Sequence, residues 1–251
     1  MKASICIATH DKPTYLRKTL ESIYRQPIAR TTEIEVIVVD DRSIGYDNYI
    51  ICSEFPSVNY IRLEGKSDYR NPAVARNVAY RAAKGEIIIC ESDDTIHITE
   101  NCIELLISQL TPGKFVIANV FNADFNGNIV PGNLDNPEYS PLTVYTGPTN
   151  QRPFFFLGSL YRKDLYAVGG NDEEFTAPGR EDDWFAQCLI NGLGITPFYT
   201  TNIVGHHLQH KHLGSKQASR PSYLLYAEKY KRASNKEILW QSAQGPWQYD
   251  S

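Results

Sequence analysis

One segment near the middle of the chain reads Glu86-Ile87-Ile88-Ile89-Cys90-Glu91-Ser92-Asp93-Asp94. Its apolar run is typical of a strand that is buried on both faces, as in a parallel sheet covered by helices. The carboxylates at its end oppose each other's ionisation unless a cation neutralises them. A divalent ion such as Mg²⁺ or Mn²⁺, shared with the phosphates of a substrate, would do so. The alternative is an exposed acidic turn or a helix N-terminus, where Asp is favoured.

The same alternation of apolar runs and helical spacing occurs on both sides of this segment. Strands are predicted at 4–8, 35–39, 58–63 and 115–118, and helices at 13–24, 72–84 and 99–110. Gly85 is expected to end the second of these helices as a C-cap. The pattern predicts an α/β fold in which helices flank a mostly parallel central sheet.

The composition changes in the second half of the chain. Between Asn122 and Arg152 it shifts to Asn, Gly, Pro and Asp, which predicts long loops or an irregular insertion. Regular structure is expected to resume with an apolar run at 154–160, a helix at 182–191 closed by Gly192, and a strand at 195–200. A last helix is predicted at 222–233, where apolar residues are available for docking.

Bulk properties restrict the function classes. The chain has 251 residues, a formal net charge of -4 and five cysteines. This charge gives no general attraction to nucleic acid, although a locally basic C-terminal stretch leaves peripheral membrane contact open. The cysteines are widely spaced without a CxxC pair, which favours a reducing compartment. Because no apolar run approaches ~20 residues, we expect a cytoplasmic protein without a transmembrane segment.

Two further acidic clusters and a histidine cluster carry possible chemistry. In Asp40-Asp41-Arg42-Ser43, a carboxylate either begins an Asx turn or accepts hydrogen bonds from a nucleobase or a ribose. In Gly179-Arg180-Glu181-Asp182-Asp183-Trp184, an acid either caps a helix or acts as a general base. The segment His206-His207-Leu208-Gln209-His210-Lys211-His212 is expected just after a strand. Its imidazoles, combined with carboxylates, would favour Mn²⁺ somewhat over Mg²⁺.

Five sequence segments between residues 3 and 210 occur in an order that resembles a known protein family. They are Ile5-Cys6-Ile7-Ala8-Thr9-His10-Asp11, Val38-Val39-Asp40-Asp41-Arg42-Ser43, Asn71-Pro72-Ala73-Val74-Ala75-Arg76-Asn77, Glu91-Ser92-Asp93-Asp94, and Val168-Gly169-Gly170-Asn171-Asp172 running into Glu181-Asp182-Asp183-Trp184. Together they resemble the GT-A fold glycosyltransferases of family 2. The resemblance implies a GT-A (Rossmann-like) domain at 1–215, with a nucleotide-binding half at 1–120, an irregular acceptor-binding half at 121–215, and a C-terminal helical extension at 216–251.

The resemblance also implies roles for particular residues. Those expected near the nucleotide are Thr9, Asp11, Asp40, Asp41, Arg70, Arg76, Glu91 and Asp93. Glu91 replaces the usual first Asp of the metal motif, so its ribose contact departs from the family pattern. Either Asp93 or Asp94 would ligate Mn²⁺ or Mg²⁺, and the candidate histidines are His206 and His207, with His210 less favoured.

The implied reaction is transfer with inversion from a nucleoside diphosphate sugar, with a UDP-sugar favoured. Asp182 would deprotonate the acceptor hydroxyl of a glycan, lipid or protein, while Glu181 and Trp184 orient that acceptor. A catalytically silent GT-A-like module that binds a glycan or a nucleotide is the alternative, and Glu91 is the departure that supports it. A nucleotidyltransferase would require a Gly-rich phosphate loop, which Thr9-His10-Asp11-Lys12-Pro13 does not offer.

Overall fold

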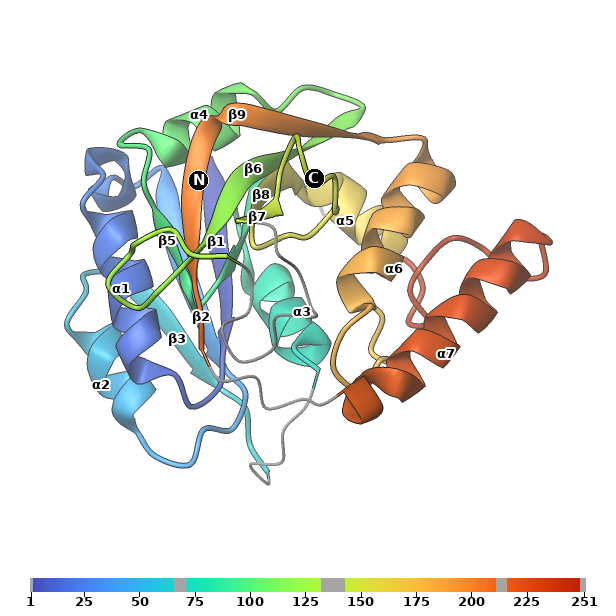
Figure 1. Ribbon diagram of the computed structural model, residues 1–251, viewed down its shortest axis with the longest axis horizontal. Helices are drawn as coiled ribbons and strands as arrows, with labels where there is room; N and C mark the ends of the chain where they lie inside the picture. Colours follow the sequence, from blue (N-terminus) through green and yellow to red (C-terminus); the bar gives the residue numbers. More distant parts are fainter. Residues whose placement is uncertain (1, 66–70, 132–142, 211–215, 249–251) are drawn as a thin grey trace.

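The computed structural model describes residues 2–65, 71–131, 143–210 and 216–248. Within these ranges the chain forms one central sheet covered by helices (Figure 1). Its strands are β1 (Ala3–Thr9), β2 (Ile34–Asp40), β3 (Val58–Arg62), β4 (Ile87–Ser92), β5 (Thr95–His97), β6 (Lys114–Ala123), β7 (Val144–Thr146), β8 (Leu157–Tyr161) and β9 (Thr196–Leu208). Its helices are α1 (Pro13–Tyr24), α2 (Asp47–Ser53), α3 (Ala73–Ala82), α4 (Cys102–Ser108), α5 (Arg162–Val168), α6 (Glu181–Gln187) and α7 (Lys216–Ser234).

The strand order positions the acidic segments at one edge of the sheet. The order is β3-β2-β1-β4-β8-β6-β9-β5, with β7 beside β6. Strands β3, β2, β1 and β4 pair in parallel, as do β6 and β9, while β8 is antiparallel to both β4 and β6. Parallel pairing therefore predominates, and the carboxyl ends of β1, β2 and β4 meet at one edge, where open α/β sheets bind ligands.

Two layers of apolar side chains hold the helices against the sheet. On one face, Leu16 and Leu20 of α1 pack with the β1 and β2 side chains that point toward them, and α4 completes this layer. On the other face, the buried side chains of α3, α5 and α6 pack against alternate residues of the same strands. Figure 1 shows α1 and α2 on one side and α3, α5, α6 and α7 on the other. The α/β fold with flanking helices and a C-terminal helix is confirmed.

Local differences from the sequence prediction have packing causes. Helix α3 ends at Ala82, and Gly85 is no left-handed cap: a Cβ there would lie 2.6 Å from the backbone carbon of Ala3. The short elements α2, α5, β5 and β7 were not predicted, and the predicted 182–191 helix continues from α6 as a π-helix at Cys188–Gly192. Part of the predicted irregular region, 132–142, lies outside the described residues.

All five cysteines are buried and free. Cys6 and Cys90 are register partners on the neighbouring parallel strands β1 and β4. None of the described helices has the length and apolar character needed to cross a membrane.

Candidate active site

The turn that follows β4 brings a carboxylate against two imidazoles of the β9 segment. Asp94 Oδ1 lies 3.6 Å from His207 Nε2, and Asp94 Oδ2 lies 2.9 Å from His210 Nε2. One ligand atom from each of these residues falls within a span of 4.8 Å. Asp94 and His207 are buried, and His210 is partly exposed. This donor set of carboxylate oxygen and imidazole nitrogen fits a divalent ion such as Mn²⁺.

An ammonium group reaches the same cluster from the loop before α1. Lys12 Nζ lies 2.7 Å from Asp94 Oδ2, 3.3 Å from Asp93 Oδ1 and 2.9 Å from His210 Nε2. Burial alone would raise the pKa of Asp94, but Lys12 and the two histidines outweigh it and hold that pKa well below its usual range. Asp94 is therefore ionised, whereas burial raises the pKa of Asp93 above its ordinary value.

The two adjacent histidines of β9 do not act together. Successive side chains of a strand point to opposite faces, so only one of the two can face Asp94. That one is His207, while the His206 ring packs edge-on against Phe121 with centroids 6.3 Å apart. Burial lowers the pKa of His206. The prediction that His206 is a ligand is therefore corrected: His210, the less favoured histidine, joins the cluster instead.

Glu91 also differs from its predicted role. Its Oε2 lies 2.7 Å from His97 Nε2, and both side chains are fully buried. The other imidazole nitrogen, Nδ1, lies 2.6 Å from the Gln26 amide nitrogen. Glu91 thus connects β4 to β5 and to the end of α1 inside the protein. This position leaves its carboxylate no surface for the predicted contact with a ribose.

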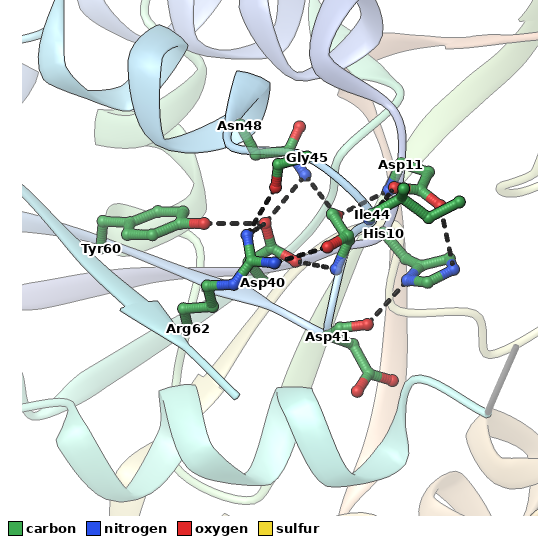
Figure 2. A network of polar contacts seen from close by, with 10 residues as sticks. His10, Asp11, Asp40, Asp41, Ile44, Gly45, Asn48, Tyr60 and Arg62 are labelled. Atoms are coloured by element: carbon green, nitrogen blue, oxygen red, sulfur yellow. Dashed lines mark hydrogen bonds and ion pairs between the residues drawn. The ribbon is translucent and has the colours of Figure 1, made fainter. Parts of the chain in front are cut away.

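Figure 2 shows a network that ties the loops after β1 and β2 together. Asp40 is fully buried, and its carboxylate accepts hydrogen bonds from the Tyr60 hydroxyl at 2.7 Å, the Ser43 backbone N–H at 2.8 Å and the Asn48 amide at 3.2 Å. Arg62 adds an ion pair to it at 3.9 Å. Since its oxygens already have these protein partners, Asp40 shapes the loop and is not placed to bind a nucleotide.

Asp11 and Asp41 lie at the rim of this network. Asp11 adopts a left-handed φ of 49°, and its Oδ1 accepts a hydrogen bond from the Ile44 N–H at 2.7 Å. His10 Nδ1 lies 2.7 Å from the Asp41 carbonyl oxygen, and Thr9 is buried at the end of β1. A cleft of about 380 Å³ opens beside these loops, and its lining residues are Arg42, Ser43, Ile44, Tyr46, Arg62, Leu63, Glu64 and Gly65.

The third acidic segment forms a separate buried cluster at the start of α6. Arg76 of α3 makes an ion pair with Asp182 and lies 3.6 Å from Glu181. The Asn71 amide donates to Glu181 Oε2 at 2.8 Å. Burial, aided by the charge of Asp182, raises the pKa of Glu181 to about 7. Arg76 therefore pairs with the two acids, which differs from the position near the nucleotide predicted for it. Arg70 lies outside the described residues.

Trp184 belongs to the core. Its side chain is fully buried, its ring packs on Trp240 with centroids 5.5 Å apart, and its Nε1–H donates to the Gln241 carbonyl at 3.3 Å. The first helical turn of α6 carries Asp182 and Trp184 two residues apart, so the two side chains point in different directions. The expectation that Trp184 contacts an acceptor is corrected accordingly.

One residue that the sequence analysis missed packs against the candidate metal cluster. The half-buried Tyr145 of β7 packs its ring against His207 with centroids 4.5 Å apart. Burial raises the pKa of its phenol, and the negative charges of Asp94 and Asp182 add to that effect. Tyr145 therefore covers one side of the His207 ring. Nothing in the Asn- and Gly-rich composition around it indicated this position.

The model of glycosyl transferase family 2 matches residues 4–169, which is more than half of the chain. The chain belongs to this family. Its matched part contains the Asp93–Asp94 turn and both sides of the Figure 2 network.

Curated members of the family are similar over parts of the chain. TarS of Staphylococcus aureus (strain Mu50), a poly(ribitol-phosphate) beta-N-acetylglucosaminyltransferase, is 32% identical over 39% of this chain and 17% of its own length. The glycosyltransferase GlyG of Streptococcus pneumoniae is 32% identical over 48% of this chain and 40% of its own. The uncharacterised glycosyltransferase YwdF of Bacillus subtilis is 28% identical over 66% of this chain and 60% of its own. The chain thus matches less than two thirds of each relative.

Solved structures share the fold. The crystal structure of S. aureus TarS has a TM-score of 0.62 at 19% identity, and the match covers 91% of this chain and 39% of TarS. The mannosyltransferase PcManGT of Pyrobaculum calidifontis, in complex with GDP-Man and Mn²⁺, also has a TM-score of 0.62, at 15% identity over 94% of this chain and 64% of its own. The family 2 fold predicted from the sequence, GT-A, is therefore confirmed.

Proposed function

We propose that this family 2 glycosyltransferase transfers a sugar with inversion from a UDP-sugar to an acceptor hydroxyl, with Mn²⁺ or Mg²⁺ as cofactor. The observation that carries the proposal is the convergence of Asp94, His207 and His210 near the carboxyl end of β4. TarS has been crystallised with UDP-GlcNAc, and PcManGT with GDP-Man and Mn²⁺, which supports a nucleotide sugar as donor and a metal as cofactor.

The residues divide into three tasks. Asp94, His207 and His210 would hold the ion, which when bound stabilises the charge that develops on the departing diphosphate. Thr9, Asp11 and Asp41 would contact the base and the ribose, and Asp93 lies beside them at the end of the neighbouring strand. Asp182 accepts the proton of the acceptor hydroxyl, and Arg76 holds its carboxylate in place. The acceptor is a glycan, a lipid or a protein.

The test is turnover of the purified protein with a panel of UDP-sugars and Mn²⁺, followed as release of UDP. Asp182→Asn should reduce transfer by about 100-fold or more, because general base catalysis contributes on that order, while donor affinity stays nearly unchanged. Asp183→Asn is the matched control, since Asp183 pairs with Arg180 at 2.9 Å in the same helical turn. An Asp182→Asn variant that keeps the wild-type rate would contradict the base assignment.

A second candidate is a silent module that binds a glycan or nucleotide. It is favoured by the Glu91–His97 pair, because Glu91, the first acid of the metal motif, is buried in the interior by this contact. The same panel separates the two functions: a silent module would bind UDP or a glycan and release no product with any donor and acceptor.

A further inference from the structure

The ammonium of Lys12 lies against the candidate metal cluster. Its ammonium contacts Asp93, Asp94 and His210, and two of its three partner atoms, Asp94 Oδ2 and His210 Nε2, also belong to the candidate ligand set. A divalent ion bound through Asp94 Oδ2 and His210 Nε2 would have to share this space with the ammonium, which carries charge of the same sign. In an inference that rests on the proposed function, we propose that a divalent ion must displace the ammonium of Lys12. The displaced ammonium then pairs with the diphosphate of the donor.

The backbone around Lys12 fixes where its side chain begins. The Asp11 N–H donates to Ser43 Oγ at 2.8 Å, and Asp11 Oδ1 accepts from Ile44, so the loop before Lys12 is tied to the loop after β2. Pro13 then begins α1 directly after it. Between these two anchors, only the flexible four-carbon side chain can move the ammonium. Displacement therefore needs a change of rotamer and no change in the loop.

Charge balance explains why displacement would depend on the donor. In the free chain the ammonium faces two carboxylates and is mostly shielded from water, with a side-chain exposure of 24%. A divalent ion bound to the same carboxylate repels the ammonium, and that carboxylate then no longer balances the charge of the ammonium. A diphosphate supplies the anionic oxygens that an ammonium binds well. Metal and nucleotide should therefore bind with positive coupling, and Lys12 should be the source of much of that coupling.

The experiment is a titration of Mn²⁺ onto the whole chain, with and without UDP, followed by the electron paramagnetic resonance signal of free Mn²⁺. For the wild type, UDP should tighten Mn²⁺ binding by about tenfold or more, within the usual range of coupling between sites. Lys12→Met retains the apolar stem and removes the charge, so it should bind Mn²⁺ alone about tenfold more tightly than the wild type. UDP should then add less. Lys114→Met, at the start of β6, is the matched control and should behave as the wild type.

Each other outcome overturns the inference in a recognisable way. Mn²⁺ affinity that is unchanged or weaker in Lys12→Met, with coupling intact, refutes displacement and leaves the proposed function standing. If UDP binds the wild type equally well with and without Mn²⁺ and does not bind the variant, Lys12 is the cation that holds UDP and no metal displaces it, which refutes the inference. Failure of both proteins to bind Mn²⁺ with UDP present removes the metal site itself. If Lys12→Met does not fold, Lys12→Gln must show the same gain, and a wild type without coupling refutes the inference.

Discussion

At the scale of single residues, the two acidic clusters are balanced by different cations. Lys12 forms ion pairs with Asp93 and Asp94, and Arg76 forms ion pairs with Glu181 and Asp182. A guanidinium keeps its charge throughout the accessible pH range, so Asp182 has a permanent partner. Glu181, at 3.6 Å from that guanidinium, is less completely compensated and titrates near neutrality.

Glu181 makes the stability of the fold depend on pH. Its pKa is raised from 4.5 in the unfolded chain to about 7 in the folded one, first by burial and then by the charge of Asp182. Its contribution is fully present below pH 4.5 and is lost as the pH rises through about 7, a change on the order of 3 kcal/mol. Glu181→Gln, which mimics the protonated acid, should flatten this decline. Urea unfolding at several values between pH 4.5 and 7.5 measures it, and parallel curves for the two proteins would contradict the assignment.

Residue roles were only partly predictable. The sequence correctly indicated that carboxylates would lie at the ends of buried strands, because that follows from the apolar runs before them. It could not separate His206 from His207, since their facing depends on the register of β9 against β6 and β5. The partners of Asp182 and Asp94 were also missed, because Arg76 and Lys12 lie 106 and 82 positions away in sequence.

At the scale of elements, strands buried on both faces were the easiest to predict. The runs that became β1, β2 and β4 are mostly apolar, so their identity does not depend on distant contacts. The sequence indicated where the apolar run of β8 lies along the chain, but not its place in the sheet. Its antiparallel insertion between β4 and β6 is a property of the assembled sheet. The short β5 exists only through its pairing with β9, so it left no periodic signal.

The turn after α5 is where an element end is most tightly packed. Gly170 has a φ of 68°, and a Cβ there would lie 2.4 Å from the Trp247 ring and 2.5 Å from Asn77 Oδ1. Gly170→Ala should therefore lower the free energy of unfolding by about 1–3 kcal/mol more than backbone strain alone would. Gly113→Ala isolates that strain, since Gly113 has a φ of 77° and open space around it. Equal losses in the two variants, measured by chemical denaturation, would argue against the packing contact.

At the scale of the whole molecule, the C-terminal segment is bound to the central sheet and its helices through a buried charge pair. Lys229 Nζ of α7 lies 3.0 Å from Asp172 Oδ2, and Asp172 is fully buried. The segment then returns along α5, where the Ser242 N–H donates to the Val168 carbonyl at 2.8 Å. The division into a domain at 1–215 and an extension at 216–251 stays a prediction, and these contacts bind the two parts closely.

Removing the charge of Lys229 should destabilise the entire fold. Lys229→Met leaves Asp172 buried without its cation, which typically costs about 3–5 kcal/mol. Lys231→Met, at an exposed position of the same helix, should change little. Thermal unfolding of the two variants gives the comparison, and one unfolding step at a lower temperature is expected for Lys229→Met. Loss of α7 alone, with the remaining domain as stable as before, would refute this coupling.

The burial of the five thiols has a consequence for the conditions under which this protein keeps its native structure. Even Cys6 and Cys90, side by side on adjoining strands, are closed off from solvent by the layers above and below them. An oxidant would reach sulfur only in a molecule that had already opened. An oxidising environment would thus leave the native structure unaltered. The free cysteines therefore do not by themselves require the reducing compartment that their spacing suggested.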